Sequence, residues 1–139
     1  MTGSGCWRQM SPAGIRFAMR FGVTNKDHLT EEVMRGYTDP FVTQQARDGL
    51  VRGGRGLSMR GFREIAKLLP SFDRPVRAIY GTEDRILPDV AQTMERLRGD
   101  LPMTEVIPVP GCGHFLQEDA PEQVGELIAE FLEADLPRR

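Results

Sequence analysis

Two short segments of this 139-residue chain carry residue types suited to acid–base chemistry. Asp84 lies in the segment GTEDRILP at residues 81–88, and His114 lies in PGCGHF at residues 110–115. Each segment follows a stretch with the composition of a β-strand, and thirty residues separate the two side chains, roughly one strand–helix–strand unit. Because the carboxyl ends of parallel strands meet at one edge of a sheet, we expect Asp84 and His114 to hydrogen-bond there. Such a carboxylate holds the imidazole in one tautomer and leaves its other ring nitrogen free to accept a proton.

Simpler interpretations of these residues stay open at this point. His114 could be a surface-turn histidine bonded to a main-chain carbonyl group, and Asp84 could be a turn residue or a helix cap, because Asp is common in turns. Glu83 is a neighbouring carboxylate that could take the part of Asp84. We interpret Asp89 only as the cap of the helix that follows it.

Cys112 stands two residues before His114, which raises the hypothesis of a thiol nucleophile. We do not favour it, because residues so close together in a tight turn seldom point at each other. A metal site built from Cys112, His114 and His28 is also disfavoured, because these residues lack the spacing of metal ligands. We therefore expect no metal and no cofactor. Cys6 and Cys112 are interpreted as free thiols, since two cysteines so far apart do not suggest a disulfide framework.

The second half of the chain alternates between strand and helix patterns, which is typical of parallel βαβ units. Strands are predicted at residues 76–80 and 104–109. Pro108 cannot donate to a ladder of hydrogen bonds, so the second strand should lie at a sheet edge or contain a bulge. Two parallel strands and one crossover helix cannot cover both faces of a sheet, so we expect further strands to come from another chain or, as we favour, from the rest of a larger protein.

Two helices are predicted in this half. The first is capped by Asp89 with the help of Gln92 and ends at Gly99. The last begins with an acidic capping box formed by Asp119 and Glu122. Its apolar residues recur at helical spacing and comprise Val124, Leu127, Ile128, Phe131 and Leu132.

The first half, up to about Phe72, contains only helical patterns. Ser11 and Thr30 are placed to cap two short helices, the second with Leu29 and Met34 as a hydrophobic staple. The remaining predictions are a third helix from Asp39-Pro40 to about Gly49, a mobile glycine-rich connection over residues 51–57, and a fourth helix that Ser58 opens and Pro70 closes, with an apolar stripe of Met59, Phe62, Ile65, Ala66 and Leu69.

The two polar segments resemble the C-terminal portion of the α/β-hydrolase superfamily. The G-x-x-D-x-x-x-P pattern at residues 81–88 is similar to the stretch that carries the family's triad acid, and G-x-G-H at 111–114 is similar to the segment that carries the triad histidine. The similarity continues through FLQEDAPE at 115–122 and covers residues 74–139. Residues 31–41 resemble the helical lid of the haloalkane dehalogenase, epoxide hydrolase and esterase-like branch.

This resemblance implies an α/β fold class: an incomplete α/β-hydrolase fold with a helical lid segment followed by a two-strand parallel βαβα unit. The lid would comprise residues 1–72, and residues 73–139 would form the C-terminal part of the core. His114 would be the triad base and Asp84 the acid that orients it. The family's nucleophile sits in a G-x-S-x-G or G-x-D-x-G turn, and this sequence contains neither. The serines, none of which stands in that frame, are Ser4, Ser11, Ser58 and Ser71.

Two functions follow as expectations. The first is a hydrolase of an ester, carbon–halogen or epoxide bond, present here as a C-terminal portion without the nucleophile and the oxyanion hole, with a small apolar substrate in the complete enzyme. The second is a non-catalytic remnant or binding module that associates with itself or with a complementing fragment through an exposed strand edge. Aromatic side chains could line a substrate cavity between lid and sheet, although packing between lid helices is the favoured interpretation; they are Trp7, Phe17, Phe21, Tyr37, Phe41 and Phe62.

Composition limits the partners of the chain. Its 18 basic and 20 acidic residues give a net charge of −2, which does not favour a nucleic-acid partner. No apolar run approaches the length of a membrane span, and the N-terminal residues lack the apolar centre of a signal peptide. We therefore expect no membrane partner and a cytoplasmic location.

Overall fold

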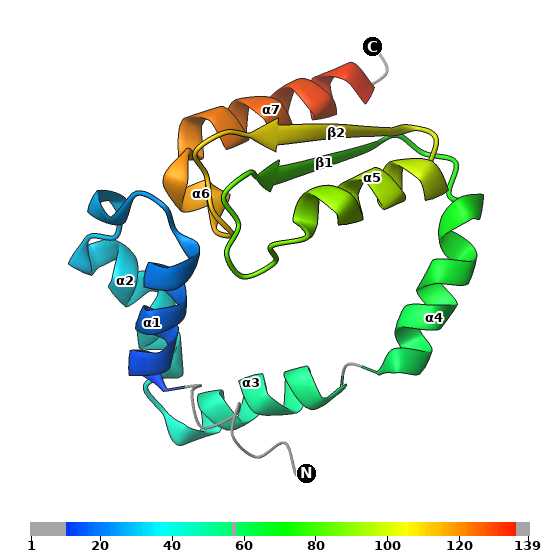
Figure 1. Cartoon of the computed structure of the whole chain (residues 1–139). Coiled ribbons are helices and arrows are strands. Elements are labelled where there is room, and N and C mark those ends of the chain that lie inside the picture. Colours follow the sequence, from blue (N-terminus) through cyan, green and yellow to red (C-terminus); the bar gives the residue numbers. More distant parts are fainter. Residues whose placement is uncertain (1–10, 57, 136–139) are drawn as a thin grey trace.

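The computed structural model describes residues 11–56 and 58–135, which form seven α-helices, two strands and three short 3-10 turns (Figure 1). The predictions that concerned Ser4, Cys6 and Trp7 lie outside these residues. The helices are α1 (Pro12–Gly22), α2 (Glu31–Thr38), α3 (Gln44–Gly56), α4 (Met59–Leu68), α5 (Val90–Asp100), α6 (Leu116–Asp119) and α7 (Pro121–Asp135); the strands are β1 (Val76–Gly81) and β2 (Thr104–Val109).

The two strands form a parallel pair, as the sequence pattern predicted. Val76 faces Thr104 at one end of the pair and Gly81 faces Val109 at the other. Within the described residues the sheet contains only these two strands, so Pro108 of β2 lies in an edge strand. The helices α5 and α7 lie on either side of the sheet (Figure 1). The fold class is therefore the predicted one, a partial α/β fold in which helices precede a βαβα unit.

Helix α7 is tied to the sheet through Arg77 of β1. The Arg77 side chain forms an ion pair of 2.7 Å with Glu105 on the neighbouring strand. Its guanidinium group also lies 5.3 Å from the centre of the Phe131 ring of α7. Only 13% of the Arg77 side chain is exposed, so the charge is shielded from water, and its contact with Phe131 helps to hold α7 on the sheet.

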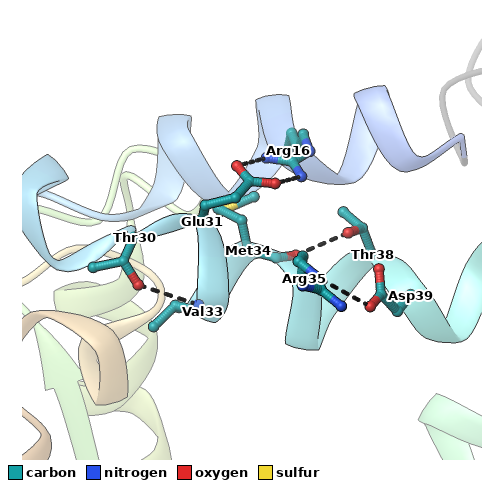
Figure 2. A network of polar contacts seen from close by, with 8 residues as sticks. All are labelled: Arg16, Thr30, Glu31, Val33, Met34, Arg35, Thr38 and Asp39. Carbon is teal, nitrogen blue, oxygen red and sulfur yellow. Dashed lines mark hydrogen bonds and ion pairs between the residues drawn. The ribbon is translucent and has the colours of Figure 1, made fainter.

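The helices α1 and α2 pack around a small apolar core. Met19 and Val23 from the end of α1 meet Leu29 and Met34 around the start of α2, and each of these side chains is less than a tenth exposed. The predicted caps are observed, since Ser11 Oγ accepts a hydrogen bond from Gly14 N–H and Thr30 Oγ1 accepts one from Val33 N–H. Outside the core, Arg16 of α1 pairs with Glu31 of α2 through both carboxylate oxygens (Figure 2).

Two predictions for the segment after α2 were wrong. Asp39 and Pro40 belong to a 3-10 turn, and the third helix begins only at Gln44, after Thr43 Oγ1 accepts a hydrogen bond from Ala46 N–H. Helix α3 then continues through Gly53 and ends at Gly56, where a mobile connection was expected. Glycine lowers helix stability but does not remove the main-chain donor, and no proline interrupts this stretch.

Helix α4 has the predicted cap, because Ser58 Oγ accepts a hydrogen bond from Gly61 N–H. Its apolar stripe nevertheless faces solvent in the described structure: the exposed fraction is 67% for Met59 and 58% for Ile65. In Figure 1, α3 and α4 form an arc that leads from α2 back to the sheet. The amphipathic pattern therefore predicted the helix correctly, but among the described residues no apolar surface covers its stripe.

Two predicted caps in the second half were also wrong. Asp89 precedes α5, but its side chain forms no capping hydrogen bond, and the helix runs one residue past Gly99 to Asp100. Asp119 ends the short helix α6, and its carboxylate accepts hydrogen bonds from distant main-chain groups, so it forms no capping box with Glu122. For Asp119, tertiary hydrogen bonds therefore compete with the local capping geometry that the sequence pattern favoured.

No helix in residues 11–56 and 58–135 combines the length and the apolar character needed to cross a bilayer.

Candidate active site

Asp84 and His114 form a hydrogen bond at the carboxyl ends of β1 and β2, as the spacing of their segments predicted. The distance from His114 Nδ1 to Asp84 Oδ2 is 2.8 Å. The Asp84 side chain is only 6% exposed and that of His114 is 30% exposed. The pair thus has a buried carboxylate and a more accessible imidazole, whose Nε2 has no hydrogen-bond partner within residues 11–56 and 58–135.

The turn after β1 holds the Asp84 carboxylate in place. Asp84 Oδ1 accepts hydrogen bonds of 2.8 Å from the N–H groups of Ile86 and Leu87. Burial raises the pKa of Asp84, but the hydrogen bonds from Leu87, His114 and Ile86 outweigh burial and bring its pKa below the ordinary value. Asp84 is therefore an anion at neutral pH, with one oxygen occupied by the turn and the other directed at the imidazole.

The loops that carry the two side chains approach each other very closely. A Cβ atom on Gly81 would lie 2.3 Å from the carbonyl oxygens of Cys112 and Gly113, so only glycine fits at the end of β1. Glu83 N–H donates to the Cys112 carbonyl oxygen at 2.9 Å. Gly111 has a φ of 75°, in the left-handed region that favours glycine. The glycines of both motifs therefore bring Asp84 and His114 within reach of each other.

The end of α1 also supports the His114 loop. The main-chain N–H of His114 donates to the Gly22 carbonyl oxygen at 2.7 Å. A Cβ atom on Gly113 would lie 2.1 Å from that same oxygen, and one on Gly22 would lie 2.6 Å from the Phe115 ring. Nothing in the sequence pattern indicated this contact, because it joins two segments that are distant along the chain.

Asp119 is a second residue near the site whose contacts the sequence did not reveal. Its carboxylate accepts hydrogen bonds from Gly113 N–H at 2.7 Å and from Asn25 N–H at 2.7 Å. The Thr24 N–H group lies 2.9 Å and 3.1 Å from its two oxygens. The local sequence suggested a helix cap at this position, and no motif pointed to the residues after α1 as its partners.

An apolar pocket of about 560 Å³ lies between α1 and the two site loops. Three of the six aromatic residues considered from the sequence line it, namely Phe17, Phe21 and Tyr37, whereas Phe41 and Phe62 do not. Arg85 and Ile86, which follow Asp84 directly, and Phe115, which follows His114, complete the near wall. The pocket is therefore lined by the residues that follow Asp84 and His114 in the chain, and not by the pair itself. Tyr37, which also lines the pocket, donates a hydrogen bond of 2.6 Å to Glu118 Oε1.

The other candidate side chains do not join the pair. The Cys112 side chain is buried, with 4% of the residue exposed, and burial together with the charges of Asp119 and Glu83 raises the pKa of its thiol, which opposes formation of a thiolate. His28 contacts the Glu118 carbonyl oxygen through Nδ1 at 2.7 Å and Asn25 through Nε2. Among the residues that the structure describes, no three or more His, Cys, Asp or Glu side chains cluster as metal ligands would.

The sequence matches the profile of the Alpha/beta hydrolase family over residues 4–127. This match spans both strands, the Asp84 and His114 loops and the first half of α7. The chain belongs to the α/β-hydrolase family. The superfamily expected from the two motifs is thereby confirmed.

Curated relatives of this α/β-hydrolase chain are hydrolases. The uncharacterized hydrolase YugF of Bacillus subtilis (strain 168) is 31% identical over 125 residues, which make up 90% of this chain and 44% of YugF. The 2-hydroxy-6-oxononadienedioate/2-hydroxy-6-oxononatrienedioate hydrolase of a Pseudomonas species is 27% identical over 130 residues, with 92% of this chain and 44% of that protein covered. The chain thus spans less than half the length of these curated relatives.

Solved structures have the same fold. A thermophilic esterase from Thermogutta terrifontis matches with a TM-score of 0.66 at 20% identity, and the match covers 92% of this chain and 47% of the esterase. A serine hydrolase involved in carbazole degradation, the CarC enzyme, matches with a TM-score of 0.63 at 17% identity and covers 90% and 48% of the two chains. At this level of identity the similarity shows the fold alone, and it extends over about half of each larger protein.

Proposed function

We propose that this chain supplies the base and the orienting acid of a hydrolase that cleaves an ester, carbon–halogen or epoxide bond through a covalent intermediate. The observation that carries the proposal is the 2.8 Å contact between His114 Nδ1 and Asp84 Oδ2 at adjacent strand ends. The family match and the hydrolase relatives support it. In this role His114 is the catalytic base and Asp84 its partner.

The electrostatics of the pair suit general base catalysis. Asp84 is ionised at neutral pH and accepts the Nδ1 proton of His114, which leaves the lone pair on Nε2 free. Nε2 can then accept a proton from a nucleophile or from the hydrolytic water, and the anionic Asp84 stabilises the imidazolium that forms. The 30% exposed fraction of the His114 side chain leaves access for these reacting groups.

The pocket beside the pair supports a small apolar substrate. Its lining includes Ile15, Phe17 and Ala18 on α1 and Phe115 next to His114, so an apolar group bound there would contact the residue that follows the imidazole in the chain. The bond that is cleaved depends on the nucleophile and the oxyanion-hole donors. The sequence contains no G-x-S-x-G or G-x-D-x-G turn, so these groups belong to another part of the complete enzyme.

The test compares two polypeptides. One is the 139-residue chain alone, and the other is the chain joined to the part of YugF that it does not match. With a p-nitrophenyl ester of a short fatty acid, we expect negligible turnover from the chain alone, because nothing positions an attacking group. The joined protein should hydrolyse the ester, and His114→Ala should abolish that activity. Turnover that survives His114→Ala would refute the proposed role of the pair.

A second candidate function is a self-associating or complementing module without turnover. The observation that favours it is the exposed apolar surface of α4, including Phe62 and Ile65, together with a described sheet of only two strands. Light scattering distinguishes the two functions when it is combined with the ester assay. A dimer without activity in either polypeptide would support the second candidate, and a monomer whose activity depends on His114 would exclude it.

A further inference from the structure

The carboxylate of Asp119 is shared by three main-chain N–H groups from two distant segments. Gly113, directly before His114, donates to Oδ2 at 2.7 Å. Asn25, beyond the end of α1, donates to Oδ1 at 2.7 Å, and Thr24 N–H lies within hydrogen-bond distance of both oxygens. Hydrogen bonds to an ionised acceptor are stronger than those between neutral groups, so this single side chain joins the two segments firmly.

The same two segments are joined a second time on the other side of Gly113. Gly22, at the end of α1, accepts the main-chain hydrogen bond of His114 at 2.7 Å. Gly113 is also packed so closely on the Gly22 carbonyl oxygen that no Cβ atom would fit between them. The backbone immediately before the imidazole is thus held between the end of α1 and the Asp119 carboxylate, which restricts the position of the His114 Cα atom.

We propose that Asp119 is a positioning residue for the catalytic base: by holding the His114 loop on the end of α1, it keeps Nδ1 of His114 on Asp84. This inference rests on the proposed function in one respect: the orientation of His114 matters for activity only if His114 is the base. Asp119 accepts hydrogen bonds from main-chain N–H groups and not from the imidazole in the described residues, so its effect passes through the backbone of Gly113. The short helix α6 that carries Asp119 also carries Glu118, the partner of the pocket residue Tyr37, so the same turn links the pocket wall to the base.

The geometry also identifies the most informative substitution. In Asp119→Asn the side chain keeps its shape, but one carboxylate oxygen becomes an NH₂ group that faces either Gly113 N–H or Asn25 N–H. Two donors then face each other at one end of the side chain, and that contact is lost. Glu126→Gln is the matched control. Glu126 is exposed on α7, and its substitution removes one negative charge, as Asp119→Asn does.

The experiment uses the whole 139-residue chain labelled with ¹⁵N-histidine, at a pH at which histidine is neutral. In the unaltered chain we expect the imidazole shifts of His114, assigned with His114→Ala, to report the Nδ1–H tautomer with a strongly deshielded Nδ1 proton. In Asp119→Asn the ratio of the Nδ1–H to the Nε2–H tautomer should fall by about tenfold or more in the folded population, because the loop loses a charge-assisted hydrogen bond. Glu126→Gln should leave the ratio unchanged. An unchanged ratio in folded Asp119→Asn would overturn the inference.

A second measurement covers the case in which Asp119→Asn does not fold. Amide hydrogen exchange in the unaltered chain should show Gly113 N–H to be as protected as Glu83 N–H, which donates to a main-chain carbonyl oxygen in the same loop pair. Rapid exchange at Gly113 would contradict the hydrogen bond from Gly113 N–H to Asp119, and with it the inference. Neither measurement requires a substrate. Asp119 can therefore be established as a positioning residue even if the joined enzyme proves inactive. The inference about Asp119 can likewise be refuted even if that enzyme is active.

Discussion

The main-chain N–H of His114 donates to the carbonyl oxygen of Gly22 at 2.7 Å, although the two residues belong to opposite ends of the chain. Next to this bond, a Cβ atom on Gly113 would lie 2.1 Å from the same Gly22 oxygen. The backbone before the imidazole therefore has no space for a side chain.

We expect Gly113→Ala to separate the His114 loop from α1, because neither backbone can move without losing hydrogen bonds. The free energy of unfolding should fall by about 2 kcal/mol or more, as for other overpacked sites. Urea denaturation measures this change. The matched control is Gly125→Ala in the middle of α7, where a Cβ atom meets nothing within 4 Å and the helix should gain about 0.5–1 kcal/mol. Equal effects of the two substitutions would contradict the close approach.

The Asp84→Asn substitution should invert the tautomer of His114. The amide oxygen can still accept from Ile86 and Leu87, so the NH₂ group faces Nδ1 and donates to it. Nε2 then carries the proton and cannot act as a base. In the enzyme joined to the missing part of YugF, kcat should fall by about 10⁴-fold, as expected for a triad in the wrong tautomer. Asp89→Asn, at a carboxylate without a capping hydrogen bond, should leave kcat unchanged; a similar loss in both variants would argue against the assignment.

The pH dependence of stability follows from the lowered pKa of Asp84. Its ionised form is favoured in the folded state, so the contribution is fully present above the ordinary pKa of 3.8 and is lost as the pH falls through the lower folded value. The difference in free energy of unfolding between the unaltered chain and Asp84→Asn should shrink as the pH falls from about 4 to about 2, where His114 is fully protonated and only Asp84 titrates. Urea denaturation across this range tests the sign, and a difference that grew on acidification would show that the hydrogen bonds do not favour the anion.

Cys112 should react slowly with alkylating reagents. The residue is 4% exposed, and burial with the nearby charges of Asp119 and Glu83 raises the pKa of its thiol, so little thiolate forms at pH 8. In a Cys6→Ser background, iodoacetamide should modify the folded chain at least about tenfold more slowly than the chain in urea. Rapid modification at neutral pH would instead revive the hypothesis that Cys112 is an activated nucleophile.

Local sequence was sufficient for the two strands and for the contact between Asp84 and His114. Alternating strand and helix patterns indicated a parallel pair, and parallel strands bring their carboxyl ends to one edge. The glycines at positions 81 and 113 belonged to the recognised motifs, and the structure assigns them a steric reason. The side-chain caps at Ser11, Thr30 and Ser58 were also predictable, because each acts within three residues of its own position.

Contacts between distant segments were not predictable in the same way. Asp119 had the sequence signature of a helix cap, yet its carboxylate accepts from Thr24, Asn25 and Gly113. The apolar stripe of α4 correctly indicated a helix but not its surroundings, since Ile65 is 58% exposed in the described structure. The glycines of α3 suggested a break, although nothing in that stretch prevents continued helical hydrogen bonding.

The amino-acid sequence by itself determined the parallel strand pair, the residues at its carboxyl end and the chemistry that a carboxylate and an imidazole can perform together. Those features depend on side-chain periodicity, glycine positions and short-range spacing, all of which act within one strand–helix–strand unit. Only the tertiary structure decided that the end of α1 and the Asp119 carboxylate hold the His114 loop, and that Phe17, Phe21 and Tyr37 line the adjoining pocket. The contacts of Asp119 with Thr24 and Asn25 join residues 95 and 94 positions apart, and no local pattern encodes which distant main-chain groups a side chain will meet once the chain has folded.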